Sequence, residues 1–170
     1  MSEARDRTAD LDPAVEREGE VELRANDRSV SEAVRLVDIL DTPLSVDDVV
    51  DSLDDPASGG LVVFVGRVRD HDHGKQVTGL SYSAHPSAMD RLRGVCERVA
   101  KEYDVRALSA VHRVGDLEIG DLAVVVATTS GHRGSAFEAS RALIDTLKAE
   151  VPIWKHQRFS DGTEEWVGAP

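Results

Sequence analysis

Two lysines near the C-terminus are the residues of this sequence best suited to chemistry. The chain of 170 residues has four lysines and sixteen arginines, and Lys148 and Lys155 stand seven residues apart on either side of Pro152 and Trp154. An ammonium group changes its pKa readily when it is partly buried, whereas a guanidinium stays charged. The pair therefore indicates a reactive site. The alternative is that Lys148 only stabilises the end of a helix and that Lys155 is a solvated loop charge.

A histidine and an arginine precede the helix that carries the first of these lysines. Ser135 and Glu138 have the spacing of a capping box, which predicts that this helix begins at Ser135. The loop before it contains His132 and Arg133. Free backbone N–H groups at a helix N-terminus, together with these two side chains, predict an anion-binding site. A pair of solvated loop residues is the alternative.

The length of this helix separates the two candidate sites. Lys148 lies in its last turn, which puts the lysine roughly 20 Å from the N-terminal end at about 1.5 Å per residue. One protomer's Lys148 and His132 can therefore hardly share one small ligand. If both belong to one active site, we expect that site to be built across a dimer interface.

A third cluster of charge surrounds residues 67–75. Arg67 and Arg69 alternate with Val68 at the end of a predicted strand, so both arginines are expected on one face. The polar loop 70–75 that follows contains two histidines and two aspartates, but their spacing matches no zinc or calcium template. We therefore expect no metal site.

The predicted elements indicate one domain of the α/β class, in the α+β sense of two layers. Alternating or β-branched segments predict strands, and apolar residues at helical spacing predict helices. Strands are expected at residues 35–40, 61–65, 77–83, 107–113 and 122–129, and helices at 45–53, 86–103 and 135–150. Residues after 155 should return as a short strand or hairpin that reaches 166–167. We expect a mostly antiparallel sheet covered by the helices 86–103 and 135–150.

Composition excludes several classes of protein. A net charge of -12 and a pI near 4.8 disfavour a nucleic-acid binder. No apolar run exceeds six residues, so no membrane span is expected. The N-terminus lacks the apolar stretch of a signal peptide, and the only cysteine, Cys96, fits a small buried hydrophobe. These features favour a cytoplasmic protein, with residues 1–33 as a flexible acidic extension and 34–170 as the folded domain.

Several spaced motifs resemble, in order, the large catalytic subunit of molybdopterin synthase. They cover about residues 35–167 and comprise residues 64–70, 82–89, 112–116, 130–133 with 137–139, 148–155 and 166–167. The resemblance implies a hammerhead-like fold with a small β subdomain.

The resemblance also implies a reaction and its residues. Members of that family form a homodimer within a heterotetramer. Each protomer accepts the C-terminal thiocarboxylate of a ubiquitin-like (β-grasp) small subunit and delivers sulfur to cyclic pyranopterin monophosphate, which gives molybdopterin without a metal or other cofactor. The family's essential lysines match Lys148 and Lys155. Its substrate-binding positions fall on Arg67, Val68, Arg69, His132, Arg133, Lys148, Lys155, His156 and Gln157.

Two other functions remain open from the residues. The chain has Ser83 and Gln157 where relatives often carry glutamate, which fits a non-catalytic docking module for a ubiquitin-like protein, with Lys148 as the acceptor of an isopeptide bond. A phosphatase-like hydrolase fits the Lys, His and Arg residues but lacks a nucleophile. A sulfur-transfer assay with a thiocarboxylated partner separates the enzyme from the docking module.

Overall fold

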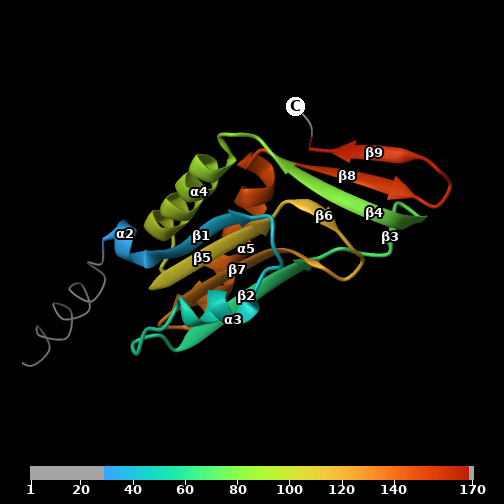
Figure 1. Ribbon diagram of the computed structural model, residues 1–170. Helices are drawn as coiled ribbons and strands as arrows, with labels where there is room; N and C mark the ends of the chain where they lie inside the picture. Colours follow the sequence, from blue (N-terminus) through green and yellow to red (C-terminus); the bar gives the residue numbers. More distant parts are fainter. Residues whose placement is uncertain (1–28, 169–170) are drawn as a thin grey trace, which may run out of the picture.

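The computed structural model describes residues 29–168 (Figure 1). Its helices are α2 (Val30–Ala33), α3 (Val46–Asp51), α4 (Ala88–Glu102) and α5 (Arg133–Glu150). Its strands are β1 (Val34–Leu40), β2 (Gly60–Arg67), β3 (His71–Asp72), β4 (Lys75–Ala84), β5 (Ala107–Arg113), β6 (Gly115–Leu117), β7 (Leu122–Ser130), β8 (Ile153–Phe159) and β9 (Glu164–Val167). No helix within the described part could span a membrane.

The expected N-terminal extension falls almost wholly outside these residues. Residues 1–28 lie beyond the described range. Residues 30–33, which the sequence assigned to the extension, form α2, and Ala33 is buried. Described secondary structure therefore begins before residue 34.

The larger sheet has the strand order β1-β5-β7-β2. Only β1 and β5 pair in parallel, while β5 with β7 and β7 with β2 are antiparallel. Strand β7 alternates strictly: Val124 and Val126 pack with the helices α4 and α5, whereas Val125 and Ala127 pack with residues of α3. The mostly antiparallel sheet and its two covering helices are thus confirmed.

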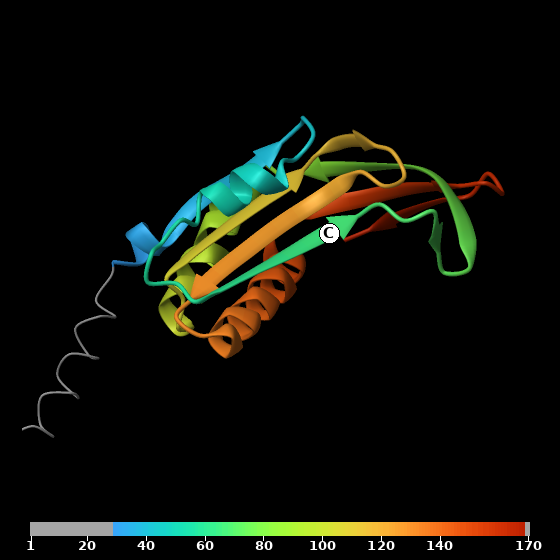
Figure 2. The ribbon, with the colours of Figure 1, turned by 90° about the horizontal axis from the view of Figure 1, so that it is seen from below.

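Helices cover both faces of this sheet. Figure 2 shows α4 and α5 on one side and the short α3 on the other. Ser45 caps α3, because its hydroxyl accepts a hydrogen bond from the backbone N–H of Asp48 at 3.1 Å, as the sequence predicted for a helix that starts there. Burial of Val49 and Leu53 fixes α3 against β5 and β7.

A second sheet extends away from the first, in the order β3-β4-β8-β9, with β6 also paired to β4 (Figure 1). The hairpin β8–β9 turns through Asp161 and Gly162, where Gly162 takes a φ of 82°. This sheet is the small β subdomain that the family resemblance implied. The short strands β3 and β6 were not predicted.

Several predicted boundaries differ from the observed ones by two residues, and those of α5 and β2 involve predicted site residues. Helix α5 begins at Arg133 with His132 as its N-cap, two residues before the expected start. The Ser135 hydroxyl donates to the Asp104 carboxylate at 3.2 Å instead of capping the helix, so His132 and Arg133 belong to the helix start rather than to a preceding loop. Strand β2 also continues past Gly66 to Arg67, with a bulge between the two residues.

Candidate active site

The two lysines line one cavity of about 370 Å³ between the two sheets. Lys148 enters it from the last turn of α5, and Lys155 from the third residue of β8. The same cavity is lined by Arg67, Tyr82 and His112. The structure therefore brings together both lysines that the sequence selected.

The chain between the lysines sets their positions. Helix α5 ends where the backbone N–H of Val151 donates to the carbonyl of Leu147, and Pro152 cannot continue the helix. Strand β8 starts at once and pairs with β4, which places Lys155 opposite Tyr82. Residues 148–155 thus contain a helix end, a tight connection and a strand start, and both lysines line one cavity.

Asp72 holds the lysine of β8 in place. Its carboxylate accepts hydrogen bonds from Lys155 Nζ at 3.1 Å and from Gln157 Nε2 at 2.9 Å, and it forms an ion pair with Arg69 at 3.3 Å. The hydrogen bond from Gln157 is the largest cause that lowers the pKa of Asp72, which falls to about 2 with a further contribution from Lys155. Gln157 is almost fully buried and also donates to Glu165 at 2.6 Å.

The arginines of the predicted cluster lie beside this network. Arg67 and Arg69 both line a narrow space of about 50 Å³ next to Lys155 and Gln157, as expected for residues on one face. Arg67 also lines the larger cavity. Val68, between them, is turned into a small core with Leu80. Val68 also lines the narrow space beside the two arginines, so its place among the substrate-binding residues stays a prediction.

A second cavity of about 660 Å³ adjoins the first through shared lining residues. Lys148, Val151 and Ile153 contribute to both. The second cavity also contains His85, Arg91 and Trp154. Lys148 therefore stands where an extended group in one cavity would meet a small molecule in the other.

Three predicted residues do not join this site within one chain. His132 and Arg133 are exposed at the opposite end of α5, where their backbone packs against Gly60 so closely that a Cβ on Gly60 would lie 3.1 Å from the Cα of Arg133. His156 lies next to Lys155 on β8 but stacks on Trp166, with ring centroids 4.3 Å apart, and bonds to Glu164. Alternation along β8 turns its side chain away from Lys155.

The sequence missed three residues of the cavity region: Asp72, Tyr82 and His112. Asp72 lies in the loop that the sequence considered only for metal binding. Tyr82 and His112 occur in motifs of the family resemblance, and the strand pattern predicted them only as parts of strands. The sequence feature that could have pointed to Tyr82 and His112 is a polar or aromatic side chain within a predicted strand.

One group among the described residues has the spacing of metal ligands. Ligand atoms of Asp72, His73 and Glu165 lie within 4.8 Å of one another. However, Asp72 is already bound by the positive charges of Lys155 and Arg69, which oppose a divalent cation at the same oxygens. The arrangement favours an internal ion-pair network over a metal centre.

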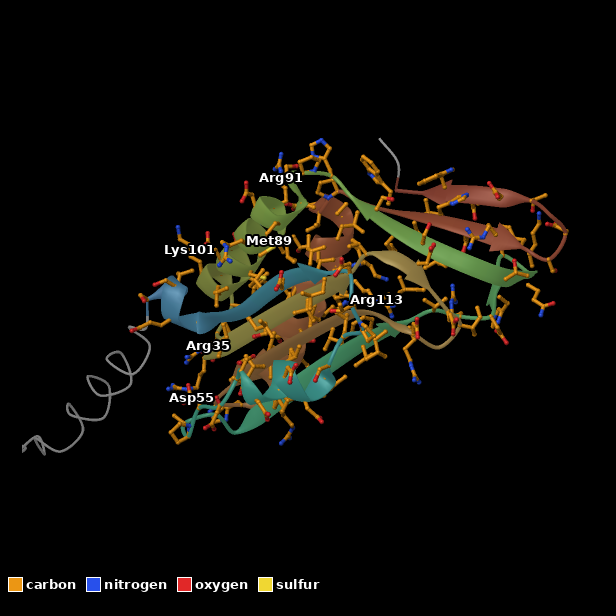
Figure 3. The ribbon with its side chains drawn as sticks, in the orientation of Figure 1. Arg35, Asp55, Met89, Arg91, Lys101 and Arg113 are labelled. Carbon is orange, nitrogen blue, oxygen red and sulfur yellow. The ribbon has the colours of Figure 1, made fainter. Side chains whose placement is uncertain are left out.

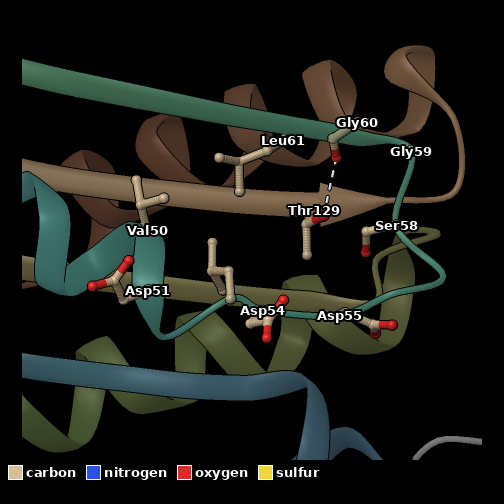
Figure 4. A pocket seen from close by; sticks show the side chains of 10 residues that line it. Val50, Asp51, Asp54, Asp55, Ser58, Gly59, Gly60, Leu61 and Thr129 are labelled. Atoms are coloured by element: carbon tan, nitrogen blue, oxygen red, sulfur yellow. Dashed lines mark hydrogen bonds between the residues drawn. The ribbon is translucent and has the colours of Figure 1, made fainter.

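A further pocket, of about 610 Å³, lies beyond α3 and is shown in Figure 4. Its charged side chains are the carboxylates of Asp51, Asp54 and Asp55. Asp55 is buried and forms an ion pair with Arg106 at 3.0 Å, which links the 54–60 turn to the start of β5. An acidic pocket of this kind cannot attract the anions that the lysine cavity suits.

Comparison with known proteins identifies the family. The MoaE protein family matches residues 39–150. The chain is 45% identical over 131 residues to molybdopterin synthase catalytic subunit 1 of Mycobacterium tuberculosis, covering 76% of this chain and 88% of that protein. It is 33% identical over 132 residues to the molybdopterin synthase catalytic subunit of Bacillus subtilis, covering 77% of this chain and 83% of that protein.

Solved structures agree with these relatives. Molybdopterin synthase from Staphylococcus aureus superposes with a TM-score of 0.71 at 31% identity, over 76% of this chain and 94% of that one. The complex of subunits 1 and 2 of molybdopterin-converting factor from Helicobacter pylori contains a chain that superposes with a TM-score of 0.60 at 25% identity. The superposition covers 77% of this chain and 89% of that one. The chain therefore belongs to the MoaE family, the catalytic subunits of the molybdopterin synthases, which are enzymes of molybdenum cofactor biosynthesis.

Proposed function

We propose that this chain transfers sulfur from the C-terminal thiocarboxylate of a ubiquitin-like small subunit to cyclic pyranopterin monophosphate, forming molybdopterin. The observation that carries the proposal is the cavity of about 370 Å³ that both Lys148 and Lys155 line together with Arg67. A thiocarboxylate and a cyclic phosphodiester are both anions. A chain of net charge -12 would repel them at most other places on its surface.

The two adjoining cavities suit the two reactants. The larger space, with His85, Arg91 and Trp154, is open enough for an extended peptide tail, and the smaller one for the pterin. Lys148 lines both and is placed to stabilise the oxyanion that develops at the carbonyl carbon of the tail as that carbon loses sulfur. The solved complex of the two subunits of the Helicobacter pylori factor supports a small-subunit partner for this chain as well.

Lys155 has a different proposed task. Its ammonium group is fixed by Asp72 and only 22% of its side chain is exposed, so it can orient the pterin or move a proton without searching many rotamers. Arg69, on the same face as Arg67, would bind phosphate.

His132 and Arg133 are proposed to complete the site of a second protomer. They lie at the far end of α5 from Lys148, a distance of roughly 24 Å for sixteen residues of helix, too far to bind the same small molecule. This end of the molecule includes the outer edge of β2, and Leu61, Phe64 and Phe137 are exposed there on β2 and on the first turns of α5. Exposed apolar residues beside an unpaired strand edge favour contact with a second copy.

A reconstituted reaction tests this function. Purified chain is mixed with a thiocarboxylated small subunit and cyclic pyranopterin monophosphate, and the small subunit is weighed by mass spectrometry. We expect its sulfur to be replaced by oxygen only when chain and precursor are both present. Unchanged thiocarboxylate in the complete mixture would refute the proposal. A small subunit joined to Lys148 by an isopeptide bond would instead support the docking module.

A further inference from the structure

His112 is a buried, titratable residue in the cavity of the two lysines. It is the sixth residue of β5 and only 7% exposed, yet it lines the same cavity as Lys148 and Lys155. It precedes Arg113, which Figure 3 labels at the end of β5 and which pairs with Asp121 at 3.0 Å. Unlike the buried Ser109, Thr128, Thr129 and Ser130 of the same sheet, His112 carries a ring nitrogen that can exchange a proton, and it lines the cavity.

Hydrogen bonding fixes the tautomer of His112. Its Nδ1 lies 2.8 Å from the backbone carbonyl oxygen of Arg113. A carbonyl oxygen can only accept, so Nδ1 carries the proton and the neutral ring has its lone pair on Nε2. Among residues 29–168, Nε2 has no hydrogen-bond partner. The edge-to-face contact with Tyr82, at 5.0 Å between ring centroids and 81° between planes, holds the ring in this orientation.

The surroundings keep this ring neutral. Burial is the main cause that lowers the pKa of His112 below its usual value, the bond to the Arg113 carbonyl partly opposes this, and the positive charge of Lys148 lowers it further. The other groups that face the cavity are Arg67 from β2, Tyr82 from β4 and Lys155 from β8, with no carboxylate among the described lining residues. Burial raises the pKa of the Tyr82 phenol, so that group stays protonated.

A cavity with this lining has cations to bind anions and a single unprotonated group that can accept a proton. Sulfur transfer needs such a group. When the thiocarboxylate sulfur displaces an oxygen from a carbon of the substrate, a carbon–sulfur bond forms, the carbon–oxygen bond breaks and its electron pair leaves with the oxygen. The small subunit then stays attached through a thioester. Release requires water: its oxygen bonds to the acyl carbon, the carbon–sulfur bond breaks, and its electron pair leaves with sulfur as a thiolate on the substrate. The water loses one proton to a base, and the new carboxyl group loses the other to solvent.

We propose that His112 is the general base that activates this water, with Nε2 as the proton acceptor. This inference rests on the proposed sulfur-transfer function and adds a catalytic residue to it. Lys148, on the same cavity, stabilises the oxyanion as water adds, while His112 makes the water nucleophilic.

The test uses His112→Asn in the full chain with its small subunit. An asparagine amide can still donate to the Arg113 carbonyl from a position near that of Nδ1, but it supplies no base. We expect product release to slow by roughly a hundredfold to ten-thousandfold. The covalent adduct of small subunit and substrate should accumulate in denaturing mass spectrometry, with KM and the thermal midpoint nearly unchanged. In His112→Gln the amide reaches toward the position of Nε2, and product release should be equally slow. This variant replaces His112→Asn in the test if His112→Asn is unstable.

The pH dependence of the release rate is a second test. The wild-type release rate should decline as pH falls through the lowered pKa of His112 and the imidazole becomes protonated, and this decline should be absent in the residual activity of His112→Asn. Normal release by both variants would overturn the inference. So would an adduct bound to Lys148 in the wild type. If wild-type chain transfers no sulfur at all, the proposed function fails instead, so the two failures are distinguishable.

Discussion

Asp72 and Lys155 are 83 residues apart in sequence, yet the carboxylate of one accepts a hydrogen bond from the ammonium of the other at 3.1 Å. The β4–β8 pairing brings them together, since β3 folds back on β4 and Lys155 lies opposite Tyr82 of β4. With 14% and 22% of their side chains exposed, neither group moves freely in solvent. This pair positions one of the two lysines that are proposed to act in sulfur transfer.

Asp72→Ala should reduce kcat on the order of tenfold to a hundredfold, because Lys155 loses its fixed position in the cavity. Asp72→Asn keeps an oxygen that can accept a hydrogen bond from Lys155, so its kcat should fall less than that of Asp72→Ala. Steady-state kinetics of the two variants checks this order. If the two substitutions are equally damaging, the charge of Asp72 matters more than the position it gives to Lys155.

The same carboxylate makes stability depend on pH. Its pKa is about 2 in the folded chain and 3.8 in the unfolded one, so the unfolded state binds more protons between these values. The stabilisation by Asp72 is therefore complete above about pH 4 and is lost as pH falls towards 2. Urea unfolding should show wild type more stable than Asp72→Asn at pH 6, with the difference shrinking at pH 2.5. A constant difference would contradict the assigned pKa.

Lys148→Ala should abolish product formation while changing the free energy of unfolding by no more than about 0.5 kcal/mol, because the side chain is exposed. Lys148→Arg should also fail, since a guanidinium cannot replace the compact ammonium. Lys101→Ala is the matched control: Lys101 occupies the last turn of α4 as Lys148 does that of α5, but lines no part of the cavity (Figure 3). Full activity in Lys148→Arg would exclude the proposed role.

Mixed dimers test whether the site is shared between protomers. Chains carrying His132→Ala with Arg133→Ala, and chains carrying Lys148→Ala, should each be inactive alone. After subunit exchange, about half the dimers are mixed and each has one intact site, so activity should recover to about one quarter of wild type. No recovery after demonstrated exchange would mean that the helix start and the lysine do not act on one ligand across the interface.

Asp55 should matter for stability and not for catalysis. Only 1% of its side chain is exposed, and it binds Arg106 Nε and the backbone N–H of Ala57. Asp55→Ala leaves a largely buried arginine without its partner and should cost about 3 kcal/mol in denaturant unfolding. Asp54→Ala, at an exposed residue of the same pocket, should cost less than about 0.5 kcal/mol. Equal losses would show that the Arg106 pair contributes little.

The sequence predicted what depends on local pattern. Apolar runs gave the strands of the larger sheet, and Ser45 marked the start of α3, because these signals lie within a few residues. The start of α5 was misplaced because the hydroxyl of Ser135 binds Asp104, which is 31 residues away in sequence. Lys148 and Lys155 were found because their type and spacing are unusual. Asp72 and His112 could not be found in this way, since only the pairing of distant strands places them beside the lysines.

The stoichiometry of the complete reaction tests the central claim most directly. Thiocarboxylated small subunit, cyclic precursor and purified chain are combined, and the loss of thiocarboxylate is measured against the molybdopterin formed. If sulfur is transferred in the lysine cavity, two thiocarboxylates should be consumed for each molybdopterin, because the dithiolene holds two sulfurs. The Lys155→Ala chain should consume no thiocarboxylate. Consumption of thiocarboxylate without molybdopterin, or equal product from Lys155→Ala, would contradict it.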